Sequence, residues 1–220
     1  ASASELLAQA ELLAEGDSAD GGLALHKLDR ALSLVEDEDL RRTILDRRSR
    51  LRAQRGAYGL ARDDLALLME VDPDNVTLRI RDAELTARAE DHASARAIYE
   101  GILDDRPNHG WTRTLLADVR RDQAAERLAE LEEELEQHLD SASLKALEPV
   151  LDHIVCLPPG DPLRTGLEAQ VLAQLPPEAQ LAATLGIAEA GAILEEVRAN
   201  YTASLSSSVT PRSLFGMIDL

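Results

Sequence analysis

Aromatic residues are scarce in this chain of 220 residues, and β-branched residues form no alternating runs. Aromatics make up 2% of the sequence, at Tyr58, Tyr99, Trp111, Tyr201 and Phe215. Because strands are enriched in both residue types, long β-strands are not expected. Leu and Ala supply most of the 45% apolar residues. They predict an all-α fold whose helices pack closely through small side chains.

Cysteine occurs once, at Cys156, which excludes a disulfide within the chain and a zinc site built from several thiolates. On an apolar helix face, this side chain is expected to be buried. The five histidines lack the i, i+4 and HExxH spacings of metal sites, and the nucleophile and phosphate-loop motifs GxSxG, GxxxxGK[ST] and GxGxxG are also missing. We therefore expect no metal, no cofactor and no catalytic residues, with a helical enzyme as a remote alternative.

Long apolar runs are missing too. No apolar stretch approaches 18 residues, so the chain is not expected to insert into a membrane. No signal peptide is visible, and the cytoplasm is the expected compartment. A secreted or periplasmic location stays open, because a removed signal would leave no trace in this sequence, and whether residue 1 is the native start also stays open.

Positive charge is in deficit, and the formal net charge is −18. Phosphate binding needs an excess of Lys and Arg, so nucleic acid is not an expected partner. Lysine occurs only at Lys27 and Lys145, against 21 arginines. This preference indicates a GC-rich genome and hence a bacterial source.

A 34-residue repeat runs through the first two thirds of the chain. Pro73 and Pro107 are 34 residues apart, and each closes an acidic stretch. Three further series keep this spacing: Ser49, Ala83 and Ala117; Leu51, Leu85 and Val119; and Ala61, Ala95 and Ala129. A period of this size is typical of stacked helical hairpins, which commonly present a binding surface.

Apolar spacing and breakers predict helices joined by short turns. The expected helices cover 4–15, 40–55, 76–90, 93–105, 110–121, 124–140, about 163–175 and 178 to about 201. Three further helices are expected, one carrying the apolar positions from Ala24 to Val35, one that ends at about Val71, and one carrying the apolar positions from Leu144 to Ile154. The predicted organisation is a repeat domain at 3–140 with about four hairpins, clearest at 40–109. A helical extension or cap at 141–203 follows, and then a linker and apolar tail at 204–220.

This pattern resembles the tetratricopeptide repeat family. Small residues at 49/83/117 and 61/95/129, and bulky ones at Leu65 and Tyr99, match its helix-crossing and packing positions. The resemblance implies a right-handed superhelical solenoid and a protein-binding role as an adaptor, scaffold or co-chaperone-like module. It also implies a concave groove lined by the first helix of each hairpin. The groove positions of the family correspond here to Asp46, Arg50, Ile80, Glu84, Arg88, Trp111, Thr114, Asp118 and Arg121.

Two interpretations of these charged positions stay open. Their arginines can bind carboxylates of a partner peptide, or the charges can pair with one another on a solvated face. For the Arg-rich helix 41–55, pairing with acidic neighbours such as Asp63 and Asp64 is favoured over an acidic-partner site. The Lys, Asn and Arg clamp of the chaperone-binding subfamily is missing from the first helices.

The apolar tail contains Leu214, Phe215, Met217, Ile218 and Leu220, and it resembles a docking motif. Packing at the chain's own end is one interpretation. Two alternatives are a regulatory module autoinhibited by its own tail, and self-association through the tail of another copy.

Overall fold

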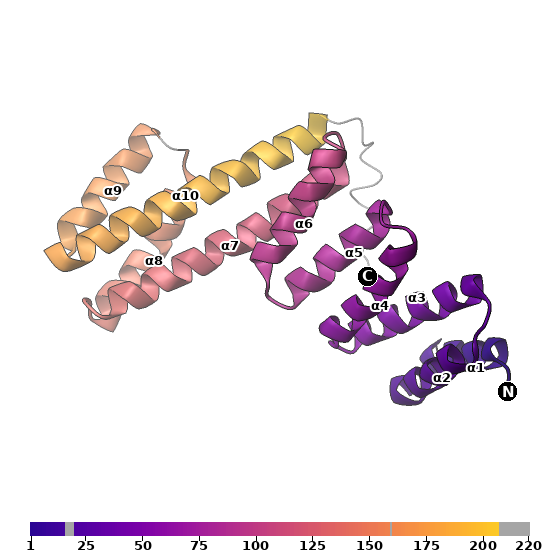
Figure 1. Ribbon diagram of the computed structural model, residues 1–220. Helices are drawn as coiled ribbons and strands as arrows, with labels where there is room; N and C mark the ends of the chain where they lie inside the picture. Colours follow the sequence, from indigo (N-terminus) through magenta and orange to yellow (C-terminus); the bar gives the residue numbers. More distant parts are fainter. Residues whose placement is uncertain (16–19, 159, 207–220) are drawn as a thin grey trace. The chain divides into compact units, whose positions relative to one another are not determined.

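The structure is a computed structural model that describes residues 1–15, 20–158 and 160–206. Within these residues the chain forms ten α-helices and no β-strand (Figure 1). The helices are α1 (Ala3–Glu15), α2 (Gly21–Leu34), α3 (Glu38–Gln54), α4 (Tyr58–Val71), α5 (Val76–Arg88), α6 (His92–Asp105), α7 (Gly110–Glu136), α8 (Ser141–Cys156), α9 (Pro162–Gln174) and α10 (Pro177–Ser206). The all-α prediction is confirmed.

The 34-residue period reappears in the ends of the helices. Asn75 caps α5 by accepting a hydrogen bond from the Leu78 amide, and His109, 34 residues later, caps α7 through the Thr112 amide. The C-terminal ends of α3 and α5 match in the same way. Gly56 and Glu90 both have positive φ, at 75° and 63°, and both close a turn that satisfies the last carbonyls.

Two compact units make up the chain, Ala1–Ile98 and Tyr99–Leu220, and the division falls within α6. In the first unit each helix from α1 to α5 packs against the next one. Buried apolar clusters hold these helices together. One is built around Leu6, Leu28 and Ile44, and another around Leu45, Leu65 and Leu85.

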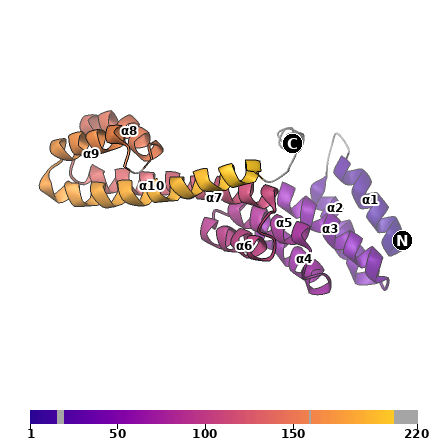
Figure 2. The same ribbon diagram turned by 90° about the horizontal axis from the view of Figure 1, so that it is seen from above.

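In the second unit α7 and α10 lie side by side, and α8 and α9 pack near them (Figures 1 and 2). The core includes Leu131 and Leu135 of α7 together with Leu151 of α8 and Ile187 of α10. Gly186 permits this close approach, because a Cβ there would lie 2.9 Å from the methyl groups of Leu131.

The fourth predicted hairpin is not formed. Instead of helices at 110–121 and 124–140, α7 is one continuous helix of 27 residues. At the position equivalent to Gly56 and Glu90 the chain has Ala124, which is helical and buried. Since Asp122 to Glu126 contain no Gly or Pro, nothing in the sequence stops the helix here. Ala129 is consequently exposed rather than placed at a helix crossing.

Two smaller expectations are also corrected. Cys156 is exposed, because it ends α8 while Ile154 and Val155 occupy the buried positions. The last helix extends to Ser206, so the first three residues of the predicted linker are helical. The proposed docking residues Leu214, Phe215, Met217, Ile218 and Leu220 lie outside the described residues.

Candidate functional site

A pocket of about 230 Å³ lies between α3 and α5, and three of the predicted groove residues line it. Arg50 comes from α3, and Glu84 and Arg88 come from α5. Arg81 joins them, because residues 81, 84, 85 and 88 share one face of a helix. The described residues thus bring charged side chains of two first helices around one opening.

A second pocket, of about 180 Å³, adjoins the first between α1 and α3. The two pockets share Arg50 and Gln54. This second pocket is more apolar, since Leu28, Leu51, Ala10 and Ala14 line it beside Glu11 and Arg47. We call the two pockets together the α1–α3–α5 surface.

Equivalent repeat positions build both pockets. Each pair is 34 residues apart, and the pairs are Arg47 and Arg81, Arg50 and Glu84, Leu51 and Leu85, and Gln54 and Arg88. The first member of each pair faces α1, and the second lines the pocket between α3 and α5. A peptide that ran along this surface would therefore meet a similar set of positions twice.

Most arginines of this surface already have acidic partners. Asp46 accepts a hydrogen bond of 2.9 Å from Arg50 Nε and also pairs with Arg81. Arg47 Nε lies 3.0 Å from Glu11 Oε1. Arg88, in contrast, is exposed and forms no hydrogen bond or ion pair with the described residues. Its guanidinium is therefore open to a partner, although it lies close enough to Glu84 for the two charges to interact.

Glu84 sits partly buried beside this free arginine. Burial raises the pKa of the Glu84 carboxyl, while the positive charges of Arg88 and Arg81 oppose that rise. Burial thus makes the charged form of Glu84 less favourable. A hydrogen-bond donor of a partner, placed next to this carboxylate, would lower that free-energy cost.

The other residues predicted to line the groove do not line either of these two pockets. Ile80 is buried, with 8% of its surface exposed, and belongs to the packed interior of the first unit. Trp111, Thr114, Asp118 and Arg121 lie on α7 in the second unit. Trp111 is half-buried, and the Thr114 hydroxyl donates to the Gly110 carbonyl.

Asp118 is engaged within the fold. It accepts a 2.5 Å hydrogen bond from the Tyr201 hydroxyl, and Arg121 lies 3.4 Å away. Burial, and then the hydrogen bond to Asp118, raise the pKa of Tyr201 to about 12. The contact fastens α10 to α7 and leaves only part of the carboxylate accessible.

The Arg-rich helix pairs largely with its own chain, as favoured above. Arg48 makes a bidentate contact with the buried Asp64 and also reaches Asp29 at 2.6 Å. Arg52 donates to Asp64 and to the Leu60 carbonyl. Burial opposes the charge on Arg48, but the hydrogen bonds to Asp64 and Asp29 outweigh it and raise its pKa. These groups fix α2, α3 and α4 together.

Arg47, Gln54 and Arg81 were not predicted as site residues. They do not occupy the family's usual groove positions, yet they share a helix face with residues that do. Extending the face by one turn in either direction from Arg50 and Glu84 would have identified them.

Other kinds of site find no support among the residues that the structure describes. No group of three His, Cys, Asp or Glu side chains there is arranged to hold a metal ion. No helix in the described part is long and apolar enough to cross a membrane.

Comparisons with known proteins assign no family. No family model matches the chain, and no curated protein matches it. A crystal structure of a protein from Bacteroides ovatus ATCC 8483, described only provisionally as a protein binding protein, is similar at 18% identity and a TM-score of 0.43. The similarity covers 90% of this chain and all of that one. At these values it assigns neither family nor function.

Proposed function

We propose that this chain is a protein-binding module of tetratricopeptide-like hairpins whose α1–α3–α5 surface holds an acidic, extended segment of a partner. The observation that carries this proposal is the pairing of repeat-equivalent residues in two adjoining pockets. The first helices of successive hairpins supply them, as in a solenoid that reads an extended chain with each repeat.

Arg88 is the principal anchor. Its guanidinium is exposed and forms no hydrogen bond or ion pair with a described residue, although its charge interacts with that of Glu84, so it can donate two parallel hydrogen bonds to a carboxylate. Arg50 is a second contact, since its side chain is 58% exposed and only its Nε is directed to Asp46. Asp46 holds Arg50 and Arg81 in place between α3 and α5 without neutralising Arg88.

The pocket beside α1 supplies an apolar contact next to these charges. Leu28 and Leu51 line it, and Ala10 and Ala14 leave room for an incoming side chain. The preferred segment therefore combines an acidic residue with a nearby aliphatic one. Arginine contacts give specificity, and apolar burial adds affinity.

Selection from a randomised peptide display library tests this function. The wild-type chain should enrich peptides in which Asp or Glu lies close to Leu, Ile, Val or Met. A double variant, Arg50→Gln with Arg88→Gln, should lose the acidic preference. Arg41→Gln is the matched control, because Arg41 is exposed on the same helix but lies outside both pockets.

Two results would contradict the proposal. One is the absence of an acidic preference in the peptides that the wild type selects. The other is selection of the same peptides by the wild type and the double variant, which would place recognition elsewhere on the chain.

A further inference from the structure

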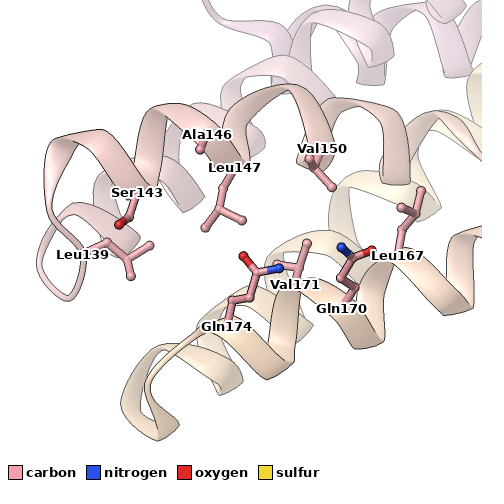
Figure 3. A pocket seen from close by; sticks show the side chains of 9 residues that line it. All are labelled: Leu139, Ser143, Ala146, Leu147, Val150, Leu167, Gln170, Val171 and Gln174. Carbon is pink, nitrogen blue, oxygen red and sulfur yellow. The ribbon is translucent and has the colours of Figure 1, made fainter.

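A separate pocket of about 380 Å³ lies between α8 and α9 in the second unit. Figure 3 shows side chains facing each other across it, with Leu139, just before α8, and Leu147 of α8 on one side and Val171 and Leu167 of α9 on the other. The volume is at the lower end of the range for ligand sites in proteins. It suits two or three side chains rather than a large cofactor.

The lining of this pocket contains no ionisable residue. Besides the four residues just named it comprises Ser143, Ala146, Val150, Gln170 and Gln174. The side chains of Gln170 and Gln174 extend from α9 towards α8 (Figure 3). Such a site favours an uncharged apolar segment whose backbone can form hydrogen bonds with side-chain amides.

Charged residues make up 29% of this chain, so few of its segments fit that description. Residues 207–220, which lie outside the described residues, contain one that does. Ser213 to Ile218 carry no ionisable side chain and include Leu214, Phe215, Met217 and Ile218. The segment is thus complementary to the pocket in polarity.

The length of α10 separates the pocket from this segment of the same chain. Gln174 is joined to the start of α10 by two residues, and the 30 residues of α10 span about 45 Å. Leu214 is only eight residues beyond Ser206, which allows a reach of at most about 28 Å. Leu214 and Phe215 therefore cannot reach the Gln174 end of the pocket of their own chain. The same residues of another molecule are not limited in this way.

We infer that residues 213–218 of one copy dock into the α8–α9 pocket of a second copy. Docking buries the apolar side chains of the segment against Leu139, Leu147 and Val171. It joins two copies of the chain, and a chain that ends at Ser206 lacks this contact. This site lies in the second unit and does not depend on the α1–α3–α5 surface.

The test combines a truncated chain ending at Ser206 with a fluorescent synthetic peptide of residues 207–220. Ala146→Glu places a charge at an exposed position in the pocket lining, without altering the core. Ala169→Glu is its matched control, an exposed alanine on α9 that does not line the pocket. Fluorescence anisotropy measures peptide binding, circular dichroism checks folding, and sedimentation equilibrium measures the mass of the full chain.

The expected results are specific. The peptide binds the truncated chain, Ala146→Glu weakens binding at least tenfold, and Ala169→Glu changes it less than twofold. The full chain forms a concentration-dependent dimer, whereas the truncated chain stays monomeric.

Three results would overturn the inference. The peptide fails to bind the folded truncated chain, or it binds both glutamate variants equally. In the third, the full chain is monomeric although the peptide binds the truncated one, which means that the segment does not join two copies.

Discussion

Residues 34 positions apart adopt the same backbone conformation even where their side chains differ. Gly56 and Glu90 occupy equivalent turns with positive φ, although only glycine adopts this conformation without strain. Gly56 lies in a predicted turn after the expected helix 40–55, but nothing in the sequence indicates the same backbone at a glutamate. The hydrogen bonds of the turn impose it, because the Glu90 and Asp91 amides satisfy the Ala87 and Thr86 carbonyls.

Glu90→Gly should therefore stabilise the protein. Removing the side chain relieves a left-handed conformation that costs roughly 1 kcal/mol. Urea denaturation followed by circular dichroism measures the gain. Glu90→Gln is the control and should leave stability unchanged, since it removes the charge but keeps the strain. Equal gains in the two variants would show that charge, not backbone strain, is responsible.

Glu84 gives a pH-dependent prediction. Its folded-state pKa is raised by burial, so the folded protein binds this proton more tightly than the unfolded chain does. The resulting stability is fully present below the unfolded pKa of about 4.3 and is lost as pH rises through the folded pKa. Glu84→Gln should be more stable than wild type at about pH 7, with the difference shrinking towards about pH 4.

Denaturant titrations of both proteins at several pH values, at low micromolar concentration, measure this difference. A variant that is less stable than wild type at neutral pH would contradict the prediction. It would mean that attraction to Arg88 and Arg81 exceeds the cost of burying the carboxylate.

Helices and their turns were predictable where breakers and small residues coincide. Ser49, Ala61, Ala83, Ala95 and Ala117 are all fully buried, as expected for close helix crossings. The pattern failed at Ala129, because a crossing needs a preceding turn and the sequence near Ala124 favours a helix. The spacing of small residues alone cannot show whether the turn forms.

Arginine substitutions at these equivalent alanines distinguish a buried helix crossing from an exposed position on a continuous helix. Ala61→Arg forces a long charged side chain into a buried crossing, where Ser49 donates to the Ala61 carbonyl at 3.0 Å. It should cost at least about 3 kcal/mol, and Ala95→Arg should be similarly severe. Ala129→Arg should stay within about 0.5 kcal/mol of wild type. Thermal and urea denaturation compare them, and severe destabilisation by Ala129→Arg would contradict a continuous α7.

The acidic net charge of the whole chain does not indicate where its basic residues lie, and many of them lie near the candidate site. Of the 23 Lys and Arg residues, 14 lie in residues 1–98, and the α1–α3–α5 surface is in that unit. Composition correctly gave the net charge but not its distribution. Arg50, Glu84 and Arg88 were predicted because the repeat places them. Which arginine is free depends on partners such as Asp46 and Glu11, and these contacts required the structure.

The most direct test of the account is the affinity of an acidic peptide selected by the wild-type chain. Isothermal titration calorimetry should compare the wild type, the Arg50→Gln and Arg88→Gln double variant, and the Arg41→Gln control. Loss of charge-assisted hydrogen bonds should raise the Kd of the double variant roughly tenfold or more, while the control stays within about twofold. Equal affinities for all three folded proteins would contradict the assignment of the α1–α3–α5 surface as the binding site.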